Sequence, residues 1–302
     1  MLELMLPALA AALILVGIHG YLGIHIIARG VIFVDLALAQ VAALGWALAG
    51  LGLGEQLSAL TGLPPAEASY AIGLTATLVA AALFSVTRME HTYVPQEAII
   101  GIVYVVASAG TILLAAQAPR GSEHVEALLT GQLLWVTWPE IIKTAAIYGL
   151  IGMAHWYFRK PFLTVSLRPQ EAKAQGLRIG WYDFWFYALF GVVVTSSVAI
   201  AGVLLVFSFL VIPAVIAFLF TTSPGRLLAV AWSVGTVATV IGLVASYQTD
   251  LPTGPTVVCT FAAALAIALV IHRVRGADPG TPRGGLVEPV AADVHDEHPP
   301  AA

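Results

Sequence analysis

Long apolar runs without charged residues dominate the sequence. They lie at 4–28, 36–54, 68–87, 98–119, 144–158, 184–225, 227–249 and 251–272. A helix needs about 20 residues to cross about 30 Å of hydrocarbon, and most of these runs have that length. Only helices and closed barrels satisfy their backbone hydrogen bonds inside lipid, and charge-free runs of this length favour helices. The pattern predicts an all-α, polytopic integral membrane protein.

The run at 184–225 is too long for one span. A helix can break at Ala201-Gly202 and at Pro213, so we expect two spans here. The second of them, at about 203–221, is expected to be short or re-entrant. The run that starts at 144 extends back to about 139 if Lys143 reaches the interface. These adjustments predict about nine membrane segments.

Composition agrees with this class and divides the chain into two parts. The 302 residues are 59% hydrophobic and only 10% charged, too few polar residues to cover a water-soluble globule of this length. The net charge of −4 is small, and no basic, aromatic-rich surface suggests nucleic acid. We expect a transmembrane domain at 1–275. The tail at 276–302, rich in Gly, Pro and acidic residues, is expected to be disordered.

The basic residues predict the orientation, because cytoplasmic loops retain Lys and Arg. With the N-terminus outside, 11 of the 13 basic residues face the cytoplasm, and the exceptions are Arg120 and Lys143. Five of the 11 lie in the loop at 159–183. This predicts a multi-pass membrane protein with that loop in the cytoplasm, and the family resemblance given below implies a bacterial cytoplasmic membrane.

Two polar segments between spans are expected to be partly helical. In the 159–183 loop, Pro169 suits a first helical turn and Gly176 a C-terminal cap, which predicts a short cytoplasmic helix. A solvated connector is the alternative. The segment at 123–140, EHVEALLTGQLLWVTWPE, has an apolar part too short to span. It predicts a re-entrant or interfacial helix with Trp135 and Trp138 at headgroup depth.

Four polar residues near the first turn lie inside predicted membrane segments. His19 and His25 precede the Arg29-Gly30 turn, and Asp35 and Gln40 follow it. If the two helices pack as a hairpin, His19 lies at the depth of Gln40, and His25 at the depth of Asp35. Each pair could contact a passing cation or form an interhelical hydrogen bond. A salt link from Asp35 to Arg29 is a further alternative.

Other polar residues near the membrane have simpler interpretations. His155 and His272 lie near inner helix ends, where interfacial anchoring is expected. Asp250 either caps the turn at 252–255 or docks a soluble protein outside, and the cap is favoured. We expect Asp250, Pro252 and Gly254 to mark a helix break, as Gly202 and Pro213 do, and such breaks could act in gating.

Several stretches together resemble a known family. The Arg29–Gly45 segment is followed by LLTGQLLWVTWPEI at 128–141, AGVLLVFSFLVIPAVIAFL at 201–219 and DLPTGPTVV at 250–258. PQEAIIGIVY at 95–104 and QEAKAQG at 170–176 add to the match. In this order and spacing, the stretches are similar to the membrane subunits of bacterial ABC importers for zinc, manganese and iron.

The chain departs from that family at one place. Members usually carry Gly-Asp-Ala-Leu-Ser-His-Ala in the second span, which puts an aspartate and a histidine one turn apart. Aligned on Gly45, the aspartate position is Leu36 and the histidine position is Gln40. Asp35 is displaced by one residue, about 100° around the helix. The usual ligand pair is therefore absent.

The resemblance implies a function and a set of partners. It implies a homodimeric permease, embedded in lipid, that moves a divalent metal ion into the cytoplasm, with zinc expected before manganese or iron. An extracytoplasmic metal-binding protein would deliver the ion. Cytoplasmic ATPase subunits would bind at the coupling segment, which contains Arg168, Pro169, Glu171, Ala172 and Gly176.

The sequence predicts no cofactor and no enzyme activity for this chain. It contains no Walker-type glycine loop, so a separate polypeptide would hydrolyse ATP. A secondary cation transporter is the alternative function, and it would couple ion flow through buried carboxylates at broken helices. An intramembrane hydrolase is a weaker alternative, because the sequence has neither His-Glu-x-x-His nor Gly-x-Ser-x-Gly.

Overall fold

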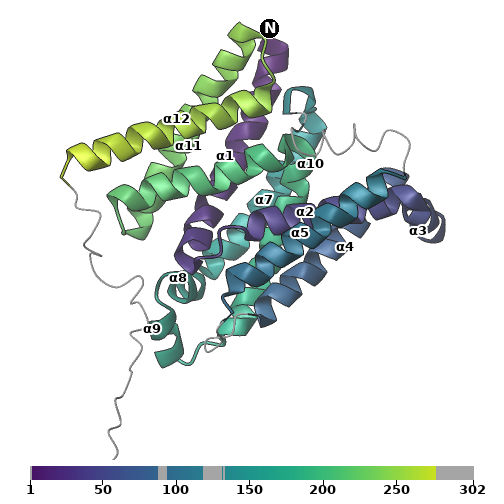
Figure 1. Ribbon diagram of the computed structural model, residues 1–302, viewed down its shortest axis with the longest axis horizontal. Helices are drawn as coiled ribbons and strands as arrows, with labels where there is room; N and C mark the ends of the chain where they lie inside the picture. The colour runs from purple at the N-terminus through teal and green to yellow at the C-terminus, as the bar shows by residue number, and fades with distance from the viewer. Residues whose placement is uncertain (1, 88–93, 118–130, 132, 277–302) are drawn as a thin grey trace, which may run out of the picture.

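The computed structural model describes residues 2–87, 94–117, 131 and 133–276, and within these ranges all regular structure is helical (Figure 1). The predicted all-α class is therefore confirmed for the described residues. Residues 277–302 of the predicted tail, and 123–130 and 132 of the segment predicted at 123–140, lie outside them. The α-helices are α1 (Leu2–Arg29), α2 (Val34–Leu48), α3 (Gly54–Thr61), α4 (Pro65–Val86), α5 (Gln96–Ala115), α7 (Trp138–Tyr157), α8 (Arg159–Leu167), α9 (Pro169–Ala174), α10 (Ile179–Phe220), α11 (Pro224–Thr249) and α12 (Thr253–Val274).

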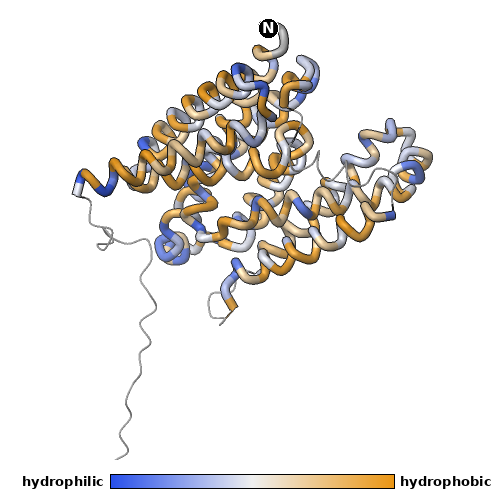
Figure 2. The backbone as a smooth tube through the Cα atoms, turned by 45° about the horizontal axis from the view of Figure 1, so that its top comes forward, coloured by the Kyte–Doolittle hydropathy of each residue, from blue (hydrophilic) through white to orange (hydrophobic). Residues whose placement is uncertain are grey.

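Seven helical stretches of the described chain are long and apolar enough to cross a membrane. Figure 2 shows apolar residues along the long helices and hydrophilic residues mostly near their ends. The stretches are α1, α2 extended through α3, α4, α5, α10, α11 and α12. α10 contains 42 residues, and its backbone is non-helical at Gly202 (φ 75°, ψ 161°), as the sequence predicted. Counting α10 twice and adding the 20-residue α7 would give nine spans, and that number stays a prediction.

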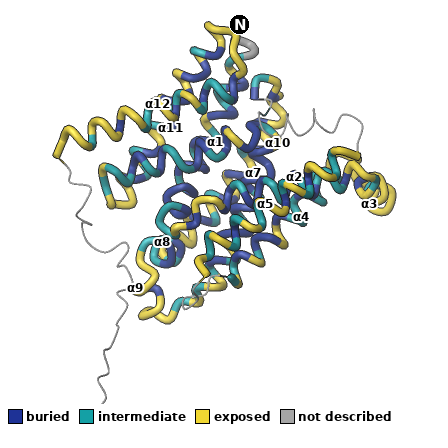
Figure 3. Tube along the Cα trace, in the orientation of Figure 1, coloured by how far each residue is buried: buried dark blue, intermediate teal, exposed yellow. Residues whose placement is uncertain are grey.

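α10 connects two groups of helices. On one side it packs against α1, α11 and α12, and on the other against α4 and α2, which also packs on α5. Its side chains include many of the fully buried aromatic residues, among them Phe186, Phe190 and Phe209. Figure 3 shows that buried positions concentrate around α10 and the middle of α1. Side chains on α10 can therefore reach both groups.

The predicted hairpin of the first two spans is wrong, although its turn forms. Gly30 adopts φ 68° and its amide donates to the Ile27 carbonyl, but α1 and α2 then run in different directions (Figure 1). Small residues explain the choice of partners, because they let helix backbones approach closely. A Cβ at Gly45 of α2 would lie 2.7 Å from Gly73 Cα on α4, whereas α1 packs against α10, α11 and α7.

The segment before α7 lies against the break in α10. Gly131 adopts φ 71°, and a Cβ on it would lie 2.1 Å from the carbonyl carbon of Ala201. Leu133–Trp135 then form a short 3-10 turn. Trp135 and Trp138 are 75% and 48% exposed, and their position at headgroup depth stays a prediction. Gly131 therefore lies directly against the Ala201-Gly202 break that the sequence predicted.

Gly23 sets the approach of α1 to the second half of α10. A Cβ at this position would lie 2.0 Å from the carbonyl oxygen of Leu210, so even alanine would force the backbones apart. Gly17, two turns earlier on the same helix, has open space around its Cα. The two glycines provide a matched test of the packing.

We expect Gly23→Ala to lower the free energy of unfolding by about 1–3 kcal/mol, the usual effect of forcing extra atoms into a packed core. Gly17→Ala should leave it unchanged or raise it slightly, because alanine is the better helix former. Thermal unfolding of the purified full-length variants measures both. Equal midpoints for the two variants would contradict the close approach of α1 and α10.

Candidate functional site

Helices α8 and α9 form the connection between α7 and α10. Pro169 occupies the first turn of α9, and Gly176 follows its end with φ 68°. The amides of Gly176 and Leu177 donate to the carbonyls of Lys173 and Ala172, which is a Schellman cap. The predicted short helix with these two end signals is therefore confirmed.

α9 is almost entirely exposed on the surface of the protein. Within α9 only Ala172 is buried, and the flanking Arg168 is exposed as well. Arg168 forms an exposed ion pair with Glu171, with 3.2 Å between Nη1 and Oε2. Such a pair contributes little to stability, because water screens both charges. A nearly fully exposed helix that is attached to the long apolar helices offers a binding surface for a second protein.

A buried ion pair joins the ends of α1 and α10. Arg29 Nη1 lies 2.5 Å from Asp183 Oδ1, and both side chains are only 1% exposed. Arg29 Nε also donates to Ser166 Oγ of α8 at 2.9 Å. The Arg29 guanidinium lies over the ring of Phe186, 4.0 Å from its centre. Arg29 therefore fixes three helices to one another and, contrary to one prediction, does not pair with Asp35.

A cluster of aromatic and imidazole rings surrounds this ion pair. His25 Nδ1 lies 2.8 Å from Ser166 Oγ, so His25 is linked to Arg29 through one hydroxyl. The ring of His155 stacks on Phe162 at 4.6 Å and meets Tyr21 edge-on at 5.4 Å. His155 is only 1% exposed. Its predicted role as an interfacial anchor is wrong, because α8 folds back and covers the end of α7.

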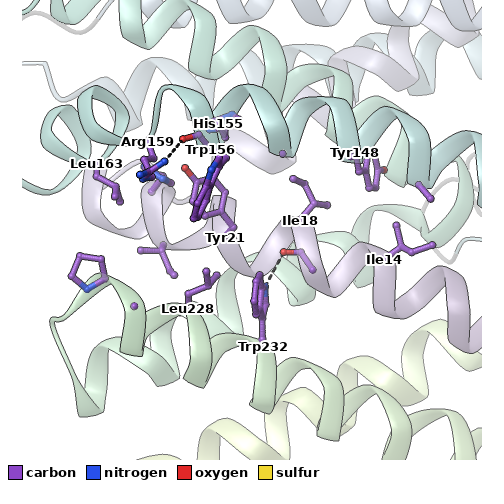
Figure 4. Close-up of a pocket in the computed structure, with 18 residues that line it drawn as sticks. Ile14, Ile18, Tyr21, Tyr148, His155, Trp156, Arg159, Leu163, Leu228 and Trp232 are labelled. Atoms are coloured by element: carbon purple, nitrogen blue, oxygen red, sulfur yellow. Dashed lines mark hydrogen bonds between the residues drawn. The ribbon is translucent and has the colours of Figure 1, made fainter.

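An apolar cavity of about 550 Å³ lies beside this cluster. It opens between α1, α7, α8 and α11 (Figure 4). Tyr21, Trp156, His155 and Arg159 gather at one end, with Tyr148 and Ile14 toward the other. Trp232 lines it from α11 and donates its indole N–H to the Gly17 carbonyl at 2.9 Å. The cavity thus has a polar end beside α8 and an apolar remainder.

His19 lies nearer the N-terminus of α1 than Tyr21 and His25, in a separate polar group. Its Nδ1 is 2.8 Å from the Leu15 carbonyl, and its ring meets Tyr148 edge-on at 6.5 Å. The Tyr148 hydroxyl in turn bonds Ser196 and Ser197 of α10. His19 Nε2 is buried without a hydrogen-bond partner in the part of the chain that the structure describes.

The other two predicted residues lie on α2, away from the histidines. Asp35, in the first turn of α2, is 1% exposed, and its Oδ1 has no hydrogen-bond partner among the described residues. Gln40 is half-buried one and a half turns later. The expected pairs of His19 with Gln40 and of His25 with Asp35 do not form, because α2 packs against α4 and α5. No three His, Cys, Asp or Glu side chains of the described chain converge as metal ligands.

The turn between α11 and α12 contains three of the predicted helix-break residues. Asp250 ends α11 in the left-handed conformation (φ 55°), Pro252 is the N-cap residue of α12 and Gly254 lies in its first turn. Ser246 ties the turn together, because its hydroxyl bonds Thr253 Oγ1 at 2.9 Å and the Leu251 carbonyl at 2.7 Å. Pro213 lies within the second half of α10, and that half continues past it.

Comparison with known proteins adds a family to this geometry. A family model described as "ABC 3 transport family" matches residues 1–272. The chain belongs to the ABC 3 transport family. This membership favours an ABC transporter over the secondary cation transporter that the sequence left as an alternative.

Two relatives and one solved structure illustrate the family. The chain is 26% identical over 237 residues to the "Chelated iron transport system membrane protein YfeD" of Yersinia pestis, covering 76% of this chain and 78% of that protein. It is 27% identical over 225 residues to the "Manganese transport system membrane protein MntC" of Listeria monocytogenes, covering 71% and 78%. The fold matches a chain of PsaBC from Streptococcus pneumoniae, solved with a Fab, with a TM-score of 0.69 and 24% identity, covering 87% and 90%.

Sequence reasoning missed several residues that this member of the ABC 3 transport family brings together. Asp183, Ser166 and Tyr21 were not singled out, because each lies at the edge of an apolar run or in a polar loop. One signal was available: Asp183 immediately precedes the charge-free run at 184–225, at the depth where Arg29 ends the first span. Opposite charges at the same membrane boundary are natural partners.

We expect Arg29→Gln and Asp183→Asn each to lower the free energy of unfolding by about 3–5 kcal/mol, because each leaves one buried charge without its ion-pair partner. Arg168→Gln, which removes the exposed ion pair, should change it by less than about 1 kcal/mol. Thermal unfolding of the purified full-length variants provides the comparison. If all three midpoints agree, the buried pair does not carry the stability assigned to it.

Proposed function

We propose that this chain is the transmembrane subunit of an ATP-binding-cassette importer that moves divalent transition-metal ions into the cytoplasm. The observation that carries the proposal is the match of the ABC 3 transport family model to residues 1–272. The relatives named for iron and for manganese transport support the cargo class. Iron and manganese are therefore the first ions to test, and zinc, which the sequence favoured, is the third.

In this proposal two copies of the chain form a homodimer in the bacterial cytoplasmic membrane. A soluble metal-binding protein delivers the ion outside, and ATPase subunits bind inside. The long apolar helices support the membrane location. The chain contains no Walker-type sequence, so hydrolysis belongs to the ATPase subunits.

The exposed helix α9 is the proposed contact for the ATPase. Every residue of α9 except Ala172 is exposed, Pro169 and Glu171 among them, and so is Arg168 immediately before the helix. Its orientation is fixed at one end by the Schellman cap at Gly176 and at the other by the connection to α8. A rigid, exposed helix can transmit a push because it does not bend away from the applied force.

The ion pathway is proposed to pass polar groups of the helices around α10. His19 offers a free imidazole nitrogen within the membrane, and Asp35 offers a free carboxylate oxygen on α2. Gln40 stays a candidate because it stands at the family's histidine position, and His25 stays one because its Nε2 is buried without a hydrogen-bond partner among the described residues. Few strong ligands agree with transport, because a passing ion must leave each site as readily as it enters.

We expect Gly176→Val to uncouple ATP hydrolysis from transport. Valine disfavours the left-handed conformation that Gly176 adopts (φ 68°), so the end of α9 must change. In vesicles that contain the permease, the ATPase and the binding protein, metal uptake per ATP hydrolysed should fall severalfold while membrane insertion is unchanged. Glu171→Ala, on the exposed face, should act in the same direction without straining the backbone.

Gly180→Ala is the matched control for these variants. Gly180 is also exposed and lies in the first turn of α10. It has open space around its Cα, and its backbone is not left-handed. Its uptake per ATP should equal that of the wild type. Normal coupling in both Gly176→Val and Glu171→Ala would mean that α9 is only a connector.

A further inference from the structure

The cluster of His25, His155 and Tyr21 contains more unsatisfied polar atoms than a membrane interior normally tolerates. Nε2 of His25, both ring nitrogens of His155 and the Tyr21 hydroxyl are buried without a hydrogen-bond partner among the described residues. A buried polar group left unpaired costs about 1–3 kcal/mol, so several together indicate a bound ion or water. All three side chains line the 550 Å³ cavity.

We propose that His25, His155 and Tyr21 form a transit site for the transported divalent metal ion at the cytoplasmic end of the cavity. The proposal rests on the proposed function for the identity of the ion. It adds a location on α1 and α7 that is separate from the α2 position where the family resemblance places its ligands. Imidazole nitrogens suit iron(II), zinc and related ions, and the phenol oxygen adds a weaker ligand.

The ring positions fit a shared ion. The ring centres are 4.7 Å apart for Tyr21 and His25, 5.4 Å for Tyr21 and His155, and 6.3 Å for the two histidines. A metal–nitrogen bond of about 2.1 Å places the centres of two imidazoles on one tetrahedral ion roughly 5 Å apart, so the two histidine rings have to approach each other by about 1 Å. One ion can therefore bridge the histidines with small side-chain adjustments, and water from the cavity can complete its coordination.

Neighbouring contacts hold both imidazoles in place. Ser166 Oγ lies 2.8 Å from His25 Nδ1. A hydroxyl oxygen has two lone pairs, so it can accept from both His25 Nδ1 and Arg29 Nε, which leaves the Nε2 lone pair of His25 for an ion. Bound histidines commonly donate their second nitrogen in this way. His155 is held by stacking on Phe162 at 4.6 Å, which leaves its ring edge available.

The charge near the site favours passage over tight binding. Arg29 repels a cation, but Asp183 lies 2.5 Å from Arg29 Nη1 and offsets its charge. The site itself contains no carboxylate, so the ion keeps most of its own charge and is held weakly. A weak site next to the cytoplasmic connection is what an ion on its way out of the membrane requires.

The test is a titration of the purified full-length chain with Co²⁺, whose visible absorption reports imidazole coordination. His155→Phe keeps the stacking on Phe162 and removes only the nitrogens. His25→Gln removes the imidazole and keeps a polar group beside Ser166. We expect each variant to weaken one Co²⁺ site at least about tenfold and to lose its absorption band. The unfolding midpoint of each variant shows that it is folded.

His272→Gln is the matched control, because His272 lies on α12 against Phe220, outside the cluster. It should bind Co²⁺ as the wild type does, and the histidines of the terminal tail are the same in every protein compared. Superimposable titrations of all folded variants would overturn the site and leave a structural cluster or a bound water.

ATP-driven metal uptake by the wild type, measured in parallel, separates this inference from the proposed function. If the wild type takes up metal but the variants bind Co²⁺ as the wild type does, the inferred transit site is contradicted and the proposed function stands. Loss of Co²⁺ binding without uptake of iron, manganese or zinc would leave a metal site in a protein with another function.

Discussion

The buried ion pair of Arg29 and Asp183 is the constraint on which the arrangement of this protein depends. Both side chains are 1% exposed, so separating them would leave a charge in a medium that solvates it poorly. The pair fixes the end of α1 to the start of α10, and α10 in turn connects the two helix groups. Gly23 allows this arrangement, because only a glycine lets α1 approach the Leu210 carbonyl so closely.

The same pair links the long apolar helices to α8 and the exposed α9. Ser166, bonded to both Arg29 and His25, lies near the end of α8, two residues before Arg168 at the start of the exposed α9. Under the proposed coupling role, a displacement of α9 would reach α8 directly and then Arg29 and His25 through one hydroxyl. The proposed ATPase contact is thus connected to His25 and Arg29 through α8 and the Ser166 hydroxyl. His19, by contrast, bonds the Leu15 carbonyl within α1.

The sequence predicted what depends on local chemistry and missed what depends on packing partners. Apolar runs located the membrane helices, Gly202 marked the break in α10, and Pro169 with Gly176 marked the ends of α9. The hairpin of α1 and α2 failed because close glycine contacts pair α2 with α4. His155 was expected at the interface, since nothing in its own segment shows that α8 folds over it. The contact of an ion with any candidate ligand stays a prediction.

The most direct test of the account is uptake of radioactive iron, manganese and zinc into vesicles that contain this chain, its ATPase and its binding protein. The account predicts uptake of at least one of these ions when ATP is hydrolysed. It predicts none when a non-hydrolysable analogue replaces ATP, whatever proton or sodium gradient is imposed. Uptake that follows an ion gradient in the absence of ATP would contradict it and would identify a secondary transporter.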